Sequence, residues 1–100
     1  MRVKFVQSGG VVGVMRGCEL DSASLPPGEA RELESLVASS GLLASGKFLS
    51  TGARDLRLYE IRVERDAGVL QVTFDDETLP APARPLVSFL RRNAQPRAGN

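Results

Sequence analysis

A pair of glycines near the N-terminus constrains this chain more than any other feature. Gly9 and Gly10 follow Ser8 and separate two runs rich in β-branched and apolar residues, at 2–7 and 11–15. A tight turn between paired strands requires positive φ angles, which glycine adopts without steric cost. The sequence therefore predicts that the chain begins with a β-hairpin whose turn lies at residues 8–10.

Composition indicates one small domain and argues against several classes of function. The chain has 100 residues, of which 42% are hydrophobic and 25% charged, and its formal net charge is +1. We expect a single domain at residues 1–93, followed by a flexible tail at residues 94–100. No apolar run approaches the roughly 20 residues of a membrane-spanning helix, and the balanced charge gives no electrostatic reason to bind nucleic acid. Since the N-terminal residues do not form a signal peptide, we expect a cytoplasmic protein, and we expect it to be a monomer.

The cysteine and histidine content limits the chemistry. Cys18 is the one cysteine and histidine is absent. A lone cysteine cannot form an internal disulfide and is usually a small buried side chain. Without histidine the chain has no Ser-His or Cys-His nucleophile, and a transition metal would lack its commonest ligand. Both observations narrow the possible chemistry, and we expect a protein that uses no metal and no cofactor.

Periodicity predicts a second hairpin in the other half of the chain. Apolar and polar residues alternate at 59–64 and again at 70–74, and residues 65–68 between them have the composition of a turn. Residues 42–56 contain several apolar side chains without a regular period, and we interpret them as an irregular loop.

Helical spacing of apolar residues predicts a helix after each hairpin. The first is expected at 27–39, with prolines at its entry and Gly41 as its stop, and the second at 83–93. The order ββαββα predicts an α+β domain: a four-stranded antiparallel sheet with two helices packed on one face. If the helices run along the strands, the connections at 8–10, 41–57 and 75–82 meet at one end of the sheet.

Two short motifs have a functional interpretation that their context disfavours. Residues 41–47 match the first seven positions of a phosphate-binding P-loop, but a helix precedes them and Phe48 stands where the Mg²⁺-binding hydroxyl would be. Three neighbouring carboxylates, Asp75, Asp76 and Glu77, suit a hard cation, although such a run before a helix is more often a solvated loop.

A basic group lies near the C-terminus, at Arg84, Arg91, Arg92 and Arg97. The aromatic residue among them, Phe89, belongs to the apolar stripe of the predicted helix. Without exposed aromatic side chains a solvated helix face is a better interpretation than a nucleic-acid surface.

Four motifs in a fixed order carry a resemblance to a known family. They are Val3-Lys4-Phe5-x-x-Ser8-Gly9-Gly10-Val11-Val12-Gly13-Val14, Leu25-Pro26-Pro27-x-Glu29-Ala30, Tyr59-Glu60-Ile61-x-Val63 and Pro85-Leu86-Val87-x-Phe89-Leu90. With these motifs, residues 2–92 resemble emfourin, the family of small bacterial inhibitors of protealysin and related thermolysin-like zinc metalloproteases. The resemblance implies a protein without enzymatic activity that blocks the active-site cleft of such a protease.

The resemblance also suggests where contact would occur. Proteases of this kind favour a large apolar residue just after the scissile bond, so an apolar side chain on a converging loop would suit the cleft. The candidate contact residues are Ser8, Gly9, Gly10, Val11, Phe48, Leu49 and Asp55. Phe48 could instead serve only to pin its loop to the core. A backbone carbonyl or the Asp55 carboxylate would be the group able to approach the catalytic zinc.

A second hypothesis from another class stays open at this point. The same loops, or a free edge of the sheet, could bind a partner that is not a protease, as in a scaffold or regulatory domain.

Overall fold

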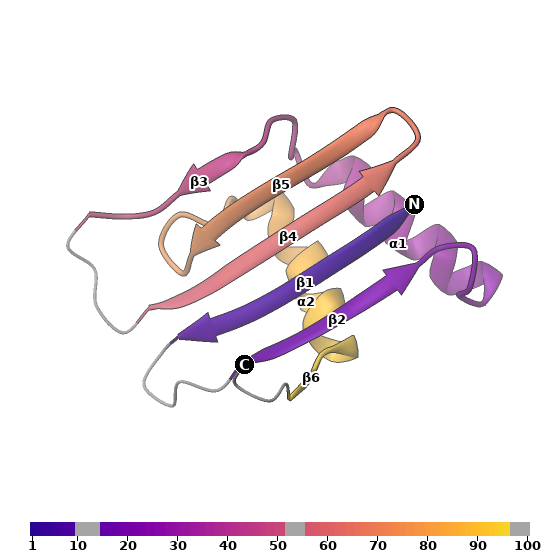
Figure 1. The fold of residues 1–100 in the computed structure, drawn as a ribbon, viewed down its shortest axis with the longest axis horizontal. Coiled ribbons are helices and arrows are strands. Elements are labelled where there is room, and N and C mark those ends of the chain that lie inside the picture. Colours follow the sequence, from indigo (N-terminus) through magenta and orange to yellow (C-terminus); the bar gives the residue numbers. More distant parts are fainter. Residues whose placement is uncertain (10–14, 52–55, 97–100) are drawn as a thin grey trace.

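The computed structural model describes residues 1–9, 15–51 and 56–96 and confirms the predicted α+β class (Figure 1). The elements are β1 (Arg2–Gly9), β2 (Arg16–Asp21), α1 (Pro27–Ser39), β3 (Gly46–Phe48), β4 (Arg57–Arg65), β5 (Gly68–Asp75), the 3₁₀ turn η1 (Ala81–Ala83), α2 (Arg84–Asn93) and β6 (Gln95–Pro96). Both predicted helices are present, and Gly41 follows α1 with a φ of 75°, as expected for a helix stop.

The sheet is larger than the sequence predicted. Among the described residues it has six strands in the order β3-β5-β4-β1-β2-β6. The prediction of a four-stranded antiparallel sheet was wrong, because β3 pairs parallel with β5 and β6 pairs antiparallel with β2. The inner strands β5, β4, β1 and β2 form the predicted antiparallel ladders. The two additional strands have three and two residues, too few for the alternation that identifies a strand in a sequence.

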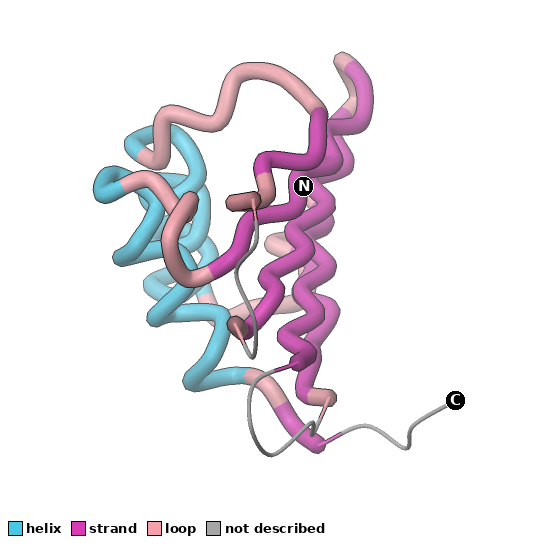
Figure 2. The backbone as a smooth tube through the Cα atoms, turned by 90° about the vertical axis from the view of Figure 1, so that its left-hand side faces the viewer, coloured by secondary structure: helices cyan, strands magenta, loops and turns pink. Residues whose placement is uncertain are grey.

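Both helices cover the same face of the sheet, as predicted (Figure 2). Alternate residues of the inner strands point toward the helices and are buried, as expected for a sheet with one covered face. The largest fully buried side chains are Phe5, Leu33, Ile61, Leu86, Leu90, Val3 and Val72. Figure 1 shows that α1 crosses the strand direction behind one end of the sheet rather than running along the strands.

The opposite face of the sheet is polar. Arg2 lies 3.5 Å from Glu19, and Arg62 lies 2.9 Å from Glu64. Exposed pairs of this kind contribute only about 0–1 kcal/mol each, but they leave the face electrically balanced. In the described part of the chain, no helix is long and apolar enough to cross a membrane.

Candidate functional site

Four strands end or begin together at one end of the sheet. β1 ends at Gly9, which lies opposite Arg57, the first residue of β4. β5 runs antiparallel to β4 and ends at Asp75, while β3 runs parallel to β5 and ends at Phe48. We call this the Gly9 end of the sheet and define it by Ser8, Gly9, Phe48, Leu49, Arg57 and Asp75.

The predicted convergence of three connections is confirmed in part. The turn after β1 and the segment after β5 both start at the Gly9 end. The third connection does not start there, because Leu42 and Leu43 line one hollow with Val69 and Leu70 from the first half of β5 and another with Phe48 and Phe74. The reason is the orientation of α1, which crosses the strand direction and leaves the chain beside the outer edge of β5. The chain reaches the Gly9 end only through β3.

The structure therefore brings together four of the predicted contact residues, Ser8, Gly9, Phe48 and Leu49. The other three, Gly10, Val11 and Asp55, lie outside the described residues.

Phe48 and Leu49 form an apolar ledge at this end. Phe48 is 44% exposed and Leu49 is 49% exposed, so each presents about half of its surface to solvent. The Phe48 ring also stacks on Phe74 with centroids 5.4 Å apart, and it covers Gly46, where a Cβ would come within 2.9 Å of the ring. Phe48 thus packs against the core and keeps an exposed edge.

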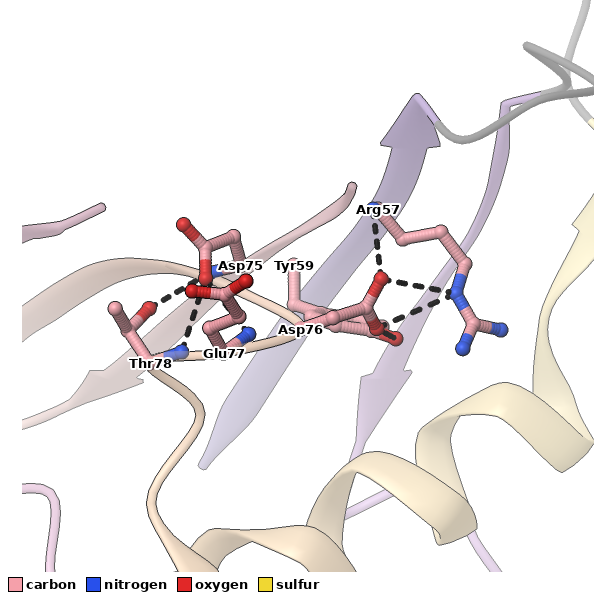
Figure 3. A network of polar contacts seen from close by, with 6 residues as sticks. All are labelled: Arg57, Tyr59, Asp75, Asp76, Glu77 and Thr78. Carbon is pink, nitrogen blue, oxygen red and sulfur yellow. Dashed lines mark hydrogen bonds and ion pairs between the residues drawn. The ribbon is translucent and has the colours of Figure 1, made fainter. Parts of the chain in front are cut away.

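The buried carboxylate of Asp75 fixes the chain directly after this ledge. Figure 3 shows the hydrogen bonds that it accepts within the turn after β5. Asp75 is only 3% exposed. Its Oδ2 accepts hydrogen bonds from the backbone N–H and the hydroxyl of Ser50, both at 2.7 Å. Its Oδ1 accepts the backbone N–H groups of Glu77 at 2.8 Å and Thr78 at 2.9 Å. Burial alone would raise the pKa of Asp75, but these four donors stabilise the charged form and hold the pKa well below its usual range.

The next residue, Asp76, fixes the start of β4 in the same way. Its Oδ2 accepts the backbone N–H of Arg57 at 2.8 Å, and its Oδ1 accepts the Tyr59 hydroxyl at 2.5 Å. The Arg57 side chain adds an ion pair at 3.3 Å. Burial raises the pKa of Tyr59 and opposes the charged form of Asp76, but the Tyr59 and Arg57 donors hold the pKa of Asp76 below its usual range.

Two consecutive carboxylates therefore clamp both ends of the segment between β3 and β4. Asp75 binds Ser50 at its start, and Asp76 binds Arg57 at its end. Charge-assisted hydrogen bonds of this kind are about twice as strong as neutral ones. The clamp ties the apolar ledge and the start of β4 to the end of β5, so Ser50 and Arg57 are held in place in the free protein.

The interpretation of residues 75–77 as a solvated loop was wrong for Asp75, which is buried and fully hydrogen-bonded. The sequence indicates part of the hydrogen bonding of Asp75. An Asp followed three residues later by Thr, as at 75 and 78, is typical of a turn in which the side chain accepts nearby backbone N–H groups. The bonds to Ser50, 25 residues away, have no local signal. Among the described residues, no cluster of three or more acidic, cysteine or histidine side chains could hold a metal ion.

Gly9 has the backbone conformation that the sequence predicts for the turn, with a φ of 79°. A Cβ at this position would lie 2.8 Å from the carbonyl oxygen of Leu56. We expect Gly9→Ala to lower the free energy of unfolding by at least about 1–2 kcal/mol, the cost of a left-handed conformation for a residue with a Cβ. Gly28→Ala is the matched control, because an added Cβ there would meet nothing within 4 Å beyond its chain neighbours and the backbone of its own helix, and helix propensity favours alanine. Chemical denaturation of both variants checks this, and equal stability of the two would contradict it.

A comparison with family models gives the decisive match. The model described as Emfourin matches residues 5–91. The chain belongs to the Emfourin family. Neither the curated proteins nor the solved structures searched gave a match. Membership of this family indicates a protease-inhibitor role and fits a protein without enzymatic activity of its own. The match spans β1 to α2, so it includes every described residue of the Gly9 end.

Proposed function

We propose that this protein inhibits a thermolysin-like zinc metalloprotease by inserting the Gly9 end of the sheet into the active-site cleft. The observation that supports this most is the apolar ledge of Phe48 and Leu49, half exposed and clamped from behind by a buried carboxylate. A large apolar side chain is what the cleft of such a protease accommodates. Ser8 and Gly9 lie at the same end and would widen the contact.

Preorganisation favours this end as an inhibitory surface. Binding costs free energy for every side chain and loop that must be ordered, about 0.5–1.5 kcal/mol for each immobilised side chain. Here the ring of Phe48 already stacks on Phe74, and Ser50 is already bound by Asp75. The ordering cost is therefore met within the free inhibitor, and more of the contact energy appears as affinity.

Inhibition in this proposal is steric rather than chemical. The Asp75 and Asp76 carboxylates accept hydrogen bonds from the protein's own donors, and zinc binding would require breaking them. Any group that approaches the zinc is then a backbone carbonyl or the Asp55 carboxylate. Blocking the cleft needs no metal ligand, provided that the interface reaches the usual total of about 1,600 Å².

Titration of a thermolysin-like protease tests the proposal. We expect peptidase activity to fall linearly with added protein and to reach its minimum near a 1:1 ratio when the enzyme concentration exceeds Kd. Competition by a short peptide substrate and recovery of the intact inhibitor should accompany the loss. A serine protease serves as the control and should keep its activity. No inhibition across a panel of thermolysin-like proteases at micromolar inhibitor would refute the proposal, and inhibition of the serine protease alone would assign a different target class.

A further inference from the structure

A basic hollow lies beside the Gly9 end, on the helix-covered side of the sheet. It has a volume of about 520 Å³ and is lined by Gln7, Arg16, Ser88, Arg91, Arg92 and Ala94. Gln7 lies on β1, two residues before Gly9, and it pairs with Arg16 on β2. The hollow therefore lies between the start of β2 and the last turn of α2, next to the proposed contact surface.

Three guanidinium groups line this hollow, and few nearby carboxylates balance their positive charge. Arg92 lies 3.9 Å from Glu32 and 5.6 Å from the centre of the Phe89 ring, two weak contacts at an exposed position. Within the described ranges, Arg16 and Arg91 form no ion pair with a carboxylate. In the sequence, the stretch shortly before Arg16, residues 10–14, contains no acidic residue either. Like charges gathered in this way favour a bound anion.

Helix electrostatics account for only part of this cluster. Arg91 and Arg92 lie in the last turn of α2, where positive charge interacts favourably with the helix dipole. Arg16 is on a strand distant in sequence and gains nothing from that dipole. The amide of Gln7 and the hydroxyl of Ser88 add neutral hydrogen-bond donors to the same hollow. Guanidinium groups with such donors match the geometry of carboxylates.

We infer that this hollow binds carboxylates on the rim of the protease's active-site cleft and steers the two proteins into contact. This inference rests on the proposed function and names the chemistry of the partner surface. Exposed charges beside an interface act mainly on the association rate, which electrostatic attraction raises by about 10- to 1000-fold. The apolar ledge then determines how long the complex lasts.

A protein surface fits the hollow better than a nucleic acid. The net charge of the chain is only +1, and the lining residues include no aromatic side chain on which a base could stack. The position next to Ser8 and Gly9 also makes the hollow continuous with the end that enters the cleft.

The test is stopped-flow association of the double variant R16E/R91E with the protease, between 0.05 and about 1 M salt. The control is Arg65→Glu, which replaces an exposed arginine on β4. Arg16, Gln7 and Tyr59 lie side by side across β2, β1 and β4. Arg65 is six residues further along β4 than Tyr59, which places it about 20 Å from these three residues. We expect the double variant to associate at least about tenfold more slowly at low salt and the control to change less than about threefold. The rates should converge near 1 M salt, where the Debye length is about 3 Å, and the dissociation rates should agree within about threefold.

The outcomes separate this inference from the proposed function. If the unmodified protein inhibits and the double variant keeps its association rate and salt dependence, the hollow has no steering role and the inhibitor proposal stands. If the unmodified protein does not inhibit, both fall. Salt-dependent binding to a DNA duplex that R16E/R91E abolishes, without any effect on protease association, would assign the hollow to a phosphate polyanion and overturn the inference.

Discussion

Asp75→Asn is expected to destabilise the protein more than any other single substitution at the Gly9 end. Each carboxylate oxygen of Asp75 accepts two hydrogen bonds, Oδ2 from Ser50 and Oδ1 from Glu77 and Thr78. An asparagine amide offers one acceptor oxygen, so in either orientation its NH₂ group faces two donors that have lost their acceptor. Buried donors without a partner are among the strongest causes of instability. Inhibition should weaken by about tenfold or more, because the ledge before Ser50 loses its anchor and must be ordered on binding.

Two further measurements keep this prediction specific. Ser50→Ala removes only the hydroxyl bond and leaves the backbone N–H of residue 50 on Asp75, so it should cost about 1.5–3 kcal/mol, the usual value for one hydrogen bond to a charged group, and less than Asp75→Asn. Acid should also reduce the effect of Asp75→Asn. The folded pKa of Asp75 lies below the unfolded value of about 3.9, so its stabilisation is present above that pH and is lost as the pH falls further. The difference between the denaturation midpoints of the two proteins should therefore be the same at pH 7 and pH 5 and smaller at pH 3, and an equal difference at all three pH values would contradict the clamp.

The sequence predicted the parts of this fold that depend on local periodicity. The strands around residues 59–64 and 70–74, the helix at 27–39 and the positive φ of Gly9 all follow from residue type and spacing. Each of these features is determined by contacts within a few residues or by one buried face, which leaves a repeating pattern.

The features that the sequence did not predict depend on pairing between distant segments. β3 exists because Gly46 to Phe48 lie beside the outer edge of β5, and its three residues carry no pattern of their own. The crossing of α1, which places residues 42 and 43 beside the outer edge of β5, depends on how its buried side chains pack on the sheet. The clamp shows the same limit, because two of the four hydrogen bonds that the Asp75 carboxylate accepts come from Ser50.

Leu49→Asp is expected to abolish most of the inhibition without unfolding the protein. Leu49 is 49% exposed, and substitutions at such positions usually change stability by about 0.5 kcal/mol or less. Side chains at the centre of an interface cost about 2–4 kcal/mol when removed, which corresponds to a 30- to 1000-fold higher inhibition constant. A carboxylate in an apolar subsite adds a desolvation cost to the lost contact. Phe48 is less suited to this test, because its ring also packs on Phe74.

Val69→Asp provides a matched control at the other end of the sheet. Val69 is 52% exposed and apolar, it lies on β5 near the opposite end, and its replacement changes the net charge by the same amount. Its inhibition constant should stay within about threefold of the unmodified protein. Comparable losses in both variants would mean that added negative charge, rather than the ledge, weakens binding. A loss confined to Val69→Asp would move the protease contact to the hollow beside Leu43 and Leu70 and exclude the Gly9 end.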